Sequence, residues 1–361
     1  HVVVRQRLDK RPGLMIRPMP FGVHVLATQG QYAGIHRFIG FRGGAVKVNI
    51  IKQGEAVVVE AHLLLMPEQW QELVFVVAAD ERAEPAHRRC LSALQSPQRF
   101  LDGARQRWER FFDEQVPTLE CDHALWTELY YHSAYVLRAN LYDFKKGAIR
   151  HPYSCPSKMK FLPSWFWDPC FHGFAEKWFR DYPAPVSTFL NHFEAQEEDG
   201  YLPMTVDARG NTWKALGVTA KACQQFLHPL TLWDHYLVHG DQRVLRRALP
   251  HLMAHDRYLQ RNREPGPDPM FVPLSGGELA DNSSRLVADT ARRKEIGTLG
   301  QRIEPVDWNS YLYASQRAMA RMATEIGDAA AARTMTARAE ARLGPLRRLW
   351  NMRTGVFTDR L

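Results

Sequence analysis

The feature that most constrains the fold is the succession of helical patterns that follows Asp122. Pairs of patterned segments are joined by short turns, at His239-Gly240-Asp241 and at Gly327-Asp328. The connections between the pairs are long and rich in glycine, proline and aromatic residues. This asymmetry predicts helical hairpins packed side by side, with the long connections gathered at one rim. We therefore expect a barrel of helices over residues 120–361.

Apolar residues at helical spacing predict where the helices lie. The expected helices are 89–112, 125–140, 174–179, 186–196, 218–239, 242–263, 308–326 and 329–350. The first of them connects the helical region to the residues before it, and we expect residues 86–119 to form a helical linker.

Residues 1–85 carry the shorter period of β-strands. Phe21, Val23 and Val25 share one side of an alternating segment, and apolar runs rich in β-branched residues follow it. Several strands at short spacing predict an N-terminal β-sandwich over 1–85. The expected fold class is therefore mostly α with an N-terminal β domain.

Composition excludes several function classes. The net charge of +8 arises from 47 basic and 39 acidic residues that are interspersed, without a block of five or six like charges, so we do not expect a nucleic-acid partner. No apolar run reaches the roughly 18 residues that span a bilayer, so we expect no membrane contact. The five cysteines lack metal-ligand spacing, which predicts reduced thiols, no metal or cofactor, and a cytoplasmic location. The oligomeric state stays open.

Aromatic and acidic residues gather just before an expected helix, in residues 163–172. Trp165 and Trp167 present rings on which the C–H face of a sugar can lie, while Asp168 and His172 offer hydrogen-bonding groups. Asp168 followed by a proline also fits a helix N-cap. The residue types leave both interpretations open, and the two are compatible.

Two further segments offer polar side chains at helix ends. Gln196 and Asp199 precede Gly200, which we expect at the C-cap of a helix. Gln196, just inside that helix end, is a candidate for hydrogen bonds to a sugar, and Gln225 adds a further polar side chain. For His228 a satisfied core position is favoured over a catalytic one.

The loop over residues 276–285 concentrates the most chemistry. Two glycines and a Pro/Gly-rich approach precede it, which predicts an irregular segment that presents Asp281. The amide and hydroxyls that follow Asp281 could satisfy its carboxyl locally, so a turn-forming role and a catalytic role are equally well supported. Arg285 closes this segment, and Asp307 with its neighbouring tryptophan begins a later helix.

Taken in order, these segments resemble the glycoside hydrolases built on the six-hairpin (α/α)6 barrel, in the group of trehalase, the processing α-glucosidase I family (GH63) and the mannosylglycerate and glucosylglycerate hydrolases. The resemblance covers about residues 120–361, and the strand-rich region fits the family's β-sandwich. The matching segments are Trp165-Phe166-Trp167-Asp168 with Phe171-His172, Gln196-Glu197-Glu198-Asp199-Gly200, Asp281-Asn282-Ser283-Ser284-Arg285 and Val306-Asp307-Trp308-Asn309.

The resemblance implies an inverting hydrolase of an α-linked glucoside-type sugar, with Asp281 as the general acid. It implies that an oligosaccharide or small glycoside is the partner, bound by Trp165, Trp167, Asp168, His172, Gln196, Asp199, Gln225, Arg285 and Asp307.

The chain departs from the family pattern in two respects. The family carries a glutamate four residues before the acid, where this chain has Gly277, and Glu278 lies three residues before it. About seven barrel helices are recognisable where the family fold has twelve, so we expect the C-terminal hairpins, and with them the general base, to be absent. A non-catalytic carbohydrate-binding protein and an (α/α)6 sugar phosphorylase-like protein remain the alternatives.

Overall fold

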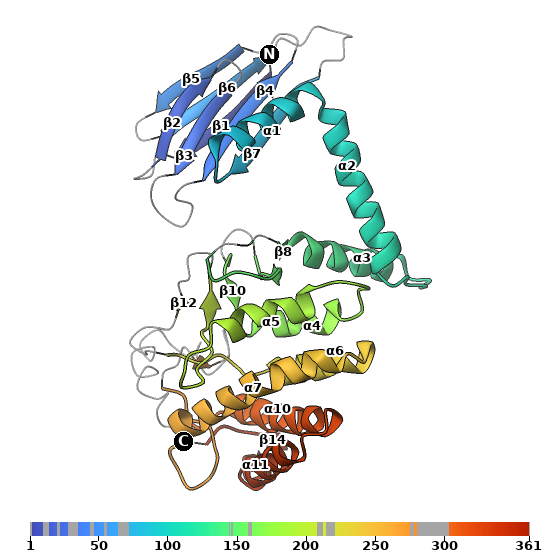
Figure 1. Ribbon diagram of the computed structural model, residues 1–361, viewed down its shortest axis with the longest axis vertical. Helices are drawn as coiled ribbons and strands as arrows, with labels where there is room; N and C mark the ends of the chain where they lie inside the picture. Colours follow the sequence, from blue (N-terminus) through green and yellow to red (C-terminus); the bar gives the residue numbers. More distant parts are fainter. Residues whose placement is uncertain are drawn as a thin grey trace. The chain divides into compact units, whose positions relative to one another are not determined.

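The computed structural model describes most of the chain, in two compact units, His1–Asp113 and Glu114–Leu361 (Figure 1). Each unit is described by itself. The described residues are 2–9, 14–19, 22–27, 35–43, 47–53, 56–63, 72–143, 145, 147–157, 161–207, 212–213, 221–274, 278–279 and 303–360.

The first unit contains two antiparallel sheets. One sheet has the strand order β1-β6-β5 and the other the order β2-β3-β4-β7. The strands are β1 Val2–Asp9, β2 Leu14–Met19, β3 Gly22–Ala27, β4 His36–Arg42, β5 Lys47–Gln53, β6 Ala56–Leu63 and β7 Val74–Asp80. In β7, partly buried and exposed residues alternate, which is the period of a strand with one face covered.

Helix α1, Ala83–Gln95, covers one face of the four-stranded sheet. Cys90 and Leu94 pack with Phe38 of β4. The approach is close at Gly40, because a Cβ there would lie 2.7 Å from Cδ1 of Leu94. Burying these apolar side chains ties α1 to the sheet.

The connecting segment holds two helices where one was expected over 89–112, so that prediction is wrong. α1 ends at Gln95, and α2, Pro97–Arg110, begins directly after Ser96. Pro97 explains the break, since proline cannot donate the helical hydrogen bond and fits the first helical position. A short π-helical turn, Phe111–Gln115, follows.

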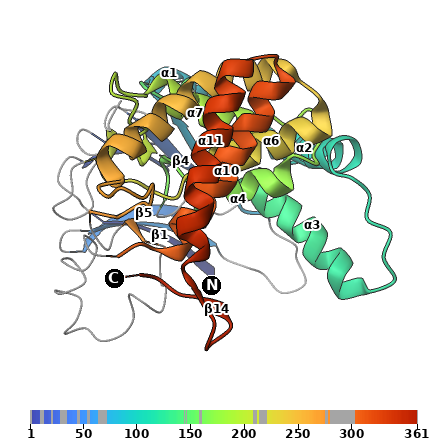
Figure 2. The same ribbon diagram turned by 90° about the horizontal axis from the view of Figure 1, so that it is seen from below.

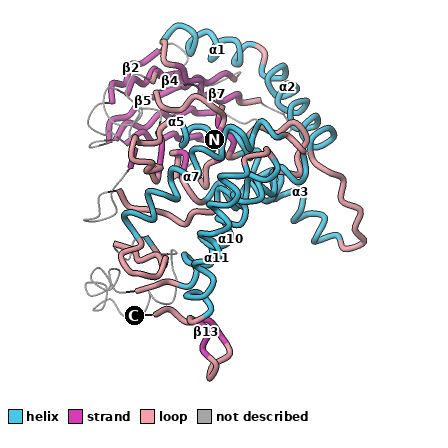
Figure 3. The backbone as a smooth tube through the Cα atoms, turned by 60° about the horizontal axis from the view of Figure 1, so that its bottom comes forward, coloured by secondary structure: helices cyan, strands magenta, loops and turns pink. Residues whose placement is uncertain are grey.

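The second unit is helical, with short strands between its helices (Figure 3). Its described residues hold seven α-helices, which follow one another in chain order in Figure 1. They are α3 Ala124–Ala139, α4 Asp168–Glu176, α5 Ala184–Glu194, α6 His228–His239, α7 Gln242–Arg263, α10 Val306–Glu325 and α11 Ala329–Arg347. In this stretch no described helix is long and apolar enough to cross a bilayer.

The helices pack in a repeating manner. α4 contacts α5 and α6, α6 contacts α7 and α10, and α10 contacts α11 as its antiparallel neighbour (Figure 2). Helices that are not consecutive in the chain, such as α4 and α6, are therefore also in contact. This arrangement is compatible with the helical toroid that the sequence predicts.

Several predicted helix ends are wrong. The helix expected over 174–179 is α4, which begins six residues earlier, at Asp168, and ends at Glu176. α6 begins at His228, ten residues after the expected start, and Pro229 in its first turn suits that beginning. α5 ends at Glu194, so Gly200 is not its C-cap. Gly200 instead lies in a turn with φ +93°, and a Cβ there would lie 2.3 Å from the backbone oxygen of Ala254 in α7. Both the conformation and the contact require glycine.

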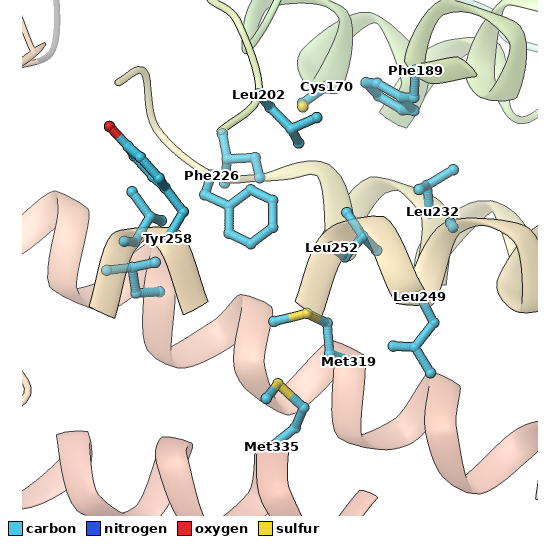
Figure 4. Packing of buried hydrophobic residues seen from close by; sticks show 14 of the residues in the cluster. Cys170, Phe189, Leu202, Phe226, Leu232, Leu249, Leu252, Tyr258, Met319 and Met335 are labelled. Atoms are coloured by element: carbon cyan, nitrogen blue, oxygen red, sulfur yellow. The ribbon is translucent and has the colours of Figure 1, made fainter. Parts of the chain in front are cut away.

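The core of this unit collects apolar side chains from successive elements (Figure 4). Leu202 and Phe226 come from loops, Leu252 from α7, Met319 from α10 and Met335 from α11, and all are almost fully buried. Met319 and Met335 face one another where the last two helices meet. The long connections thus contribute to the core as well as to the surface.

Polar side chains also cross between the last three helices. Five of these side chains form a set that we call the α7–α11 clasp: Asp256, Glu264, Gln316, Arg338 and Arg342. Gln316 Nε2 donates to Asp256 Oδ1 at 2.8 Å, and Arg338 Nε donates to Asp256 Oδ2 at 2.6 Å. Arg338 and Arg342 both donate to Glu264, and Arg342 Nε donates to Gln316 Oε1 at 3.3 Å. The buried charges of the clasp are therefore paired, as burial requires.

Candidate active site

The predicted site residues fall partly outside the described chain. Asp281 and Arg285 lie outside the described residues, so the expected approach of Asp281 to Trp167 stays a prediction. The structure describes the other candidates, which are Trp165, Trp167, Asp168, His172, Gln196, Asp199, Gln225 and Asp307.

Trp165 lies in a small antiparallel sheet of the second unit. Strand β10, Ser164–Trp165, pairs with β11, Thr205–Val206, which pairs with β12, Thr212–Trp213. The Trp165 side chain is partly buried and meets the ring of Phe161 edge-on, with centroids 5.6 Å apart. The sheet thus holds an aromatic side chain beside the loop that enters α4.

Trp167 and Asp168 sit at the beginning of α4. Trp167 occupies the N-cap position without a side-chain cap, and its ring meets that of Phe171 edge-on at 5.3 Å. Asp168 is the first helical residue, so the expected capping by Asp168 is wrong by one position. Its carboxylate lies in the first turn, where the helix dipole favours a negative charge.

His172 lies one turn further along α4 and lines a cavity of about 340 Å³. The cavity also borders α3 and residues 154–156. His172 Nδ1 is 2.9 Å from the Oγ atom of Ser154. Burial lowers the pKa of His172 to about 4, so the ring is neutral near pH 7.

Gln196 makes contacts that hold the fold together. Its Nε2 donates to the backbone oxygens of Gly200 at 3.0 Å and His251 at 2.9 Å, and its Oε1 is 2.7 Å from Nδ1 of His251. Both amide hydrogens are therefore engaged in tying the turn after α5 to α7. The structure uses this carboxamide for packing one loop on one helix.

Asp199 and Glu197 meet a lysine that the sequence reasoning did not single out. Lys221 Nζ is 2.6 Å from Asp199 Oδ2 and 2.8 Å from Glu197 Oε2. Lys221 has φ +54°, which is uncommon for a residue with a side chain. The signal available in the sequence was the pair of acids at 197 and 199, which calls for a nearby cation. This ion pair joins the turn after α5 to the loop before α6.

Gln225 is a buried candidate whose side-chain amide is unpaired among the described residues. It lies in the loop before α6, and 2% of its surface is exposed. Its Nε2 finds no hydrogen-bond partner among the described residues. Leaving a buried amide donor unpaired costs free energy, so the partner of this donor is to be sought outside the described residues.

Glu278 anchors the loop that leads to Asp281. Its Oε1 accepts from the backbone nitrogen of Cys223 at 2.7 Å and from Arg263 Nη2 at 2.9 Å, while its Oε2 accepts from the backbone nitrogen of Leu274 at 2.6 Å. The side chains of Glu278 and Arg263 are 0% and 2% exposed. One carboxylate thus joins three segments of the chain. Cys223 is two residues before Gln225, and Glu278 itself is three residues before Asp281.

The start of α10 joins this frame through Trp308. The Trp308 indole nitrogen donates to the backbone oxygen of Glu278 at 2.6 Å, and its ring stacks on Phe271 at 3.8 Å. Asp307 Oδ1 accepts from the backbone nitrogen of Trp308 at 2.9 Å. The tryptophan that follows Asp307 is therefore a core residue.

His228 is buried in the core, as predicted. Its ring lies 4.0 Å from that of Phe166 and 4.7 Å from that of Phe189. Burial, together with the neighbouring His192 and His255, lowers its pKa well below the usual value. The expectation of a fully satisfied side chain is wrong in one respect, because Nε2 has no hydrogen-bond partner among the described residues.

The described part of the chain offers no metal-binding cluster and, at Cys90 and Cys170, no activated thiol. No group of three His, Cys, Asp or Glu side chains there could hold a metal ion. The five cysteines are free thiols, as the sequence predicts. Burial raises the pKa of Cys90 to about 11 and raises that of Cys170 further, so neither thiol is activated.

Solved structures of sugar-active proteins share the fold. The GH63 mannosylglycerate hydrolase from Thermus thermophilus in complex with glucose is 18% identical, with a TM-score of 0.50 over 63% of this chain and 65% of that one. A sialidase is 12% identical, with a TM-score of 0.53 over 99% of this chain and 36% of that one. The chain thus spans less than two thirds of either structure.

Sequence comparison assigns the second unit to a protein family. No curated protein matches the sequence. The model of the mannosylglycerate hydrolase MGH1-like glycoside hydrolase domain matches residues 162–361, which contain every candidate site residue and more than half of the chain. The chain therefore belongs to the MGH1-like family of glycoside hydrolases.

Proposed function

We propose that this protein hydrolyses an α-linked, glucoside-type sugar with inversion at the anomeric carbon. The observation that carries the proposal is that the family match covers all the candidate residues, from Trp165 to Asp307. The anchoring of Glu278 adds support, because a catalytic carboxyl needs a loop whose position is held from within the core.

In this proposal Asp281 is the general acid. It protonates the glycosidic oxygen while a second carboxylate activates a water on the opposite face of the sugar, at roughly 6.5–9.5 Å for an inverting enzyme. An acid of this kind needs a raised pKa, which partial burial and a nearby like charge provide. We assign no general base to this chain.

The candidate residues supply the contacts that position the sugar. Trp165 and Trp167 stack on the ring, since aromatic faces suit the apolar side of a pyranose. Asp168 and His172 bind hydroxyls from α4, and Gln225 donates its buried amide hydrogen from the loop before α6. Arg285 and Asp307 complete the polar lining. Gln196 and Asp199 act on the fold, because their polar atoms are engaged within the protein.

The family suggests which substrates to test first. The related hydrolase from Thermus thermophilus is named for mannosylglycerate. Glycosides of a small hydroxy acid are therefore the first substrates to test, followed by α-glucosides with larger leaving groups.

The experiment compares Asp281→Asn with wild type on a panel of α-glycosides. We expect at least a thousandfold loss of hydrolysis with an unchanged circular dichroism spectrum and melting temperature. Asp122→Asn, at an exposed position before α3, is the matched control and should retain full activity. Proton NMR of the first product should show the β-anomer.

Three results would reject the proposal. Near-normal turnover by Asp281→Asn removes the assigned acid. Release of a sugar phosphate that depends on added phosphate indicates a phosphorylase. Saturable sugar binding by the wild-type chain without any turnover indicates a carbohydrate-binding protein.

A further inference from the structure

A buried carboxyl group lies behind the wall of the 340 Å³ cavity. Glu176 is in α4, four residues after His172, so both side chains lie on one face of that helix. Its exposed fraction is 1%, and its Oε1 has no hydrogen-bond partner among the described residues. The hydroxyl of Ser154 hydrogen-bonds to this carboxyl group. Within the described chain, Glu176 forms no ion pair.

Ser154 connects the carboxyl to the imidazole. It belongs to β9, Tyr153–Ser154, and is fully buried. Its Oγ is 2.9 Å from His172 Nδ1 and also contacts the Glu176 carboxyl. A hydroxyl carries one hydrogen, so it donates to one of these partners and accepts from the other.

The direction of this chain of hydrogen bonds depends on Glu176. A protonated Glu176 donates to Ser154, Ser154 donates to His172 Nδ1, and the neutral ring then carries its hydrogen on Nε2. An ionised Glu176 accepts from Ser154, Ser154 accepts from Nδ1–H, and Nε2 is then an acceptor. Because burial keeps His172 neutral, one hydrogen is shared between its two nitrogens.

The surroundings favour the protonated carboxyl. Burial raises the pKa of Glu176 to about 8, and its hydrogen bond to Ser154 only partly offsets that effect. On α4, Lys177 is paired with Asp234 of α6. The other ionisable groups near the carboxyl or the cavity are Arg138 and His132 of α3, Cys155 after β9 and Tyr182 before α5.

We propose that Glu176 is a positioning residue, which acts through Ser154 to hold His172 in the Nε2–H form. His172, which lines the cavity, then carries a hydrogen-bond donor on Nε2, suited to a hydroxyl or carboxylate oxygen of a ligand. Ionisation of Glu176 reverses the chain and turns the same position into an acceptor. That the ligand is a sugar rests on the proposed function, whereas the tautomer does not.

The test is nitrogen NMR of ¹⁵N-histidine-labelled protein, with the His172 signals assigned by their loss in His172→Gln. In wild type we expect the Nε2–H tautomer at about pH 6.5 and a shift towards Nδ1–H as the pH rises to about 9.5, on either side of the raised pKa of Glu176. Glu176→Gln should give His172 the same tautomer at both pH values, because a carboxamide does not ionise. Glu128→Gln, at an exposed site on α3, is the matched control and should behave as wild type.

Ser154→Ala breaks the chain and should make the tautomer of His172 independent of pH, even if Glu176→Gln fails to fold. The proposal is overturned if wild-type His172 is Nδ1–H at the lower pH, or if its tautomer is the same at both pH values. The readout needs no substrate. An Nε2–H tautomer in a chain that binds no sugar would support the relay and count against the proposed function.

Discussion

Replacing Glu278 by glutamine tests whether its carboxylate holds the active-site loops together. Glutamine has nearly the same shape, so the change removes charge and one acceptor oxygen and leaves little cavity. If the carbonyl oxygen keeps the bonds to Cys223 and Arg263, the new NH₂ group faces the backbone N–H of Leu274, donor against donor. Arg263, 2% exposed, also loses its counter-ion.

The size of the effect follows from these contacts. Removing one partner of a buried ion pair costs about 3–5 kcal/mol, because the remaining charge stays buried without compensation. A lost hydrogen bond to a charged acceptor is worth about 1.5–3 kcal/mol and forms part of that figure. We therefore expect Glu278→Gln to lower the free energy of unfolding by about 4 kcal/mol, or roughly 10 °C in melting temperature for a unit of this size.

Urea unfolding followed by tryptophan fluorescence measures this loss. Glu194→Gln is the control, since its partners Arg247 and His151 are both partly exposed and such surface pairs contribute about 0–1 kcal/mol each. The double variant Glu278→Gln with Arg263→Met should be less destabilised than Glu278→Gln alone, because the unpaired cation is gone. Equal unfolding midpoints for Glu278→Gln and Glu194→Gln would refute the anchoring role.

Three further predictions concern single positions. Gly200→Ala should lower the free energy of unfolding in urea by roughly 2–4 kcal/mol, because its Cβ would meet the backbone of α7. Gly327→Ala is the control, also at positive φ but with open space around it, and should lose about 1 kcal/mol. Equal losses would contradict the contact at Gly200. For Glu176, the pKa is raised from 4.5 to about 8, so its contribution to stability is complete below pH 4.5 and lost as the pH rises to 8, by up to about 5 kcal/mol at about 1.4 kcal/mol per unit. Glu176→Gln should flatten the stability profile between about pH 5 and pH 8, and a profile identical to wild type would argue against the buried carboxyl. Gln225→Leu should leave the melting temperature unchanged or higher while weakening sugar binding at least tenfold in calorimetry; a large loss of stability with unchanged binding would mean that this amide serves the fold.

Helix ends were predictable where residues next to the helix mark its beginning or end. α7 has the predicted bounds because Gly240 takes the left-handed conformation before it and the Asp241 side chain accepts from the backbone of Arg243. Asp328 caps α11 in the same way, through the backbone of Ala331. Such signals lie within a few residues of the element they delimit, so they can be recognised in the sequence.

The start of α6 was not predictable because tertiary contacts produce the same pattern as a helix. Ala222, Cys223, Phe226 and Leu227 are buried in an irregular loop, at spacings that a helical face would also show. The period of apolar residues cannot separate a buried loop from a buried helix face.

The site shows the same limit. Residue types predicted which segments carry polar and aromatic groups, but not that His251, 55 positions away, would engage Gln196. They also did not predict that Glu176 would lie buried behind His172, although the spacing of four residues on a helix was visible. Partners far apart in sequence are set by the packing of helices, which no local pattern encodes.

The α7–α11 clasp has a consequence for assembly. Apolar faces of neighbouring helices tolerate a slide of one turn, since one methionine or leucine can replace another in the interface. The clasp does not, because a slide of about 5.4 Å would leave two guanidinium groups facing no carboxylate in a dry interior. The pairing of these charges therefore favours one register for the hairpin of α10 and α11 against α7.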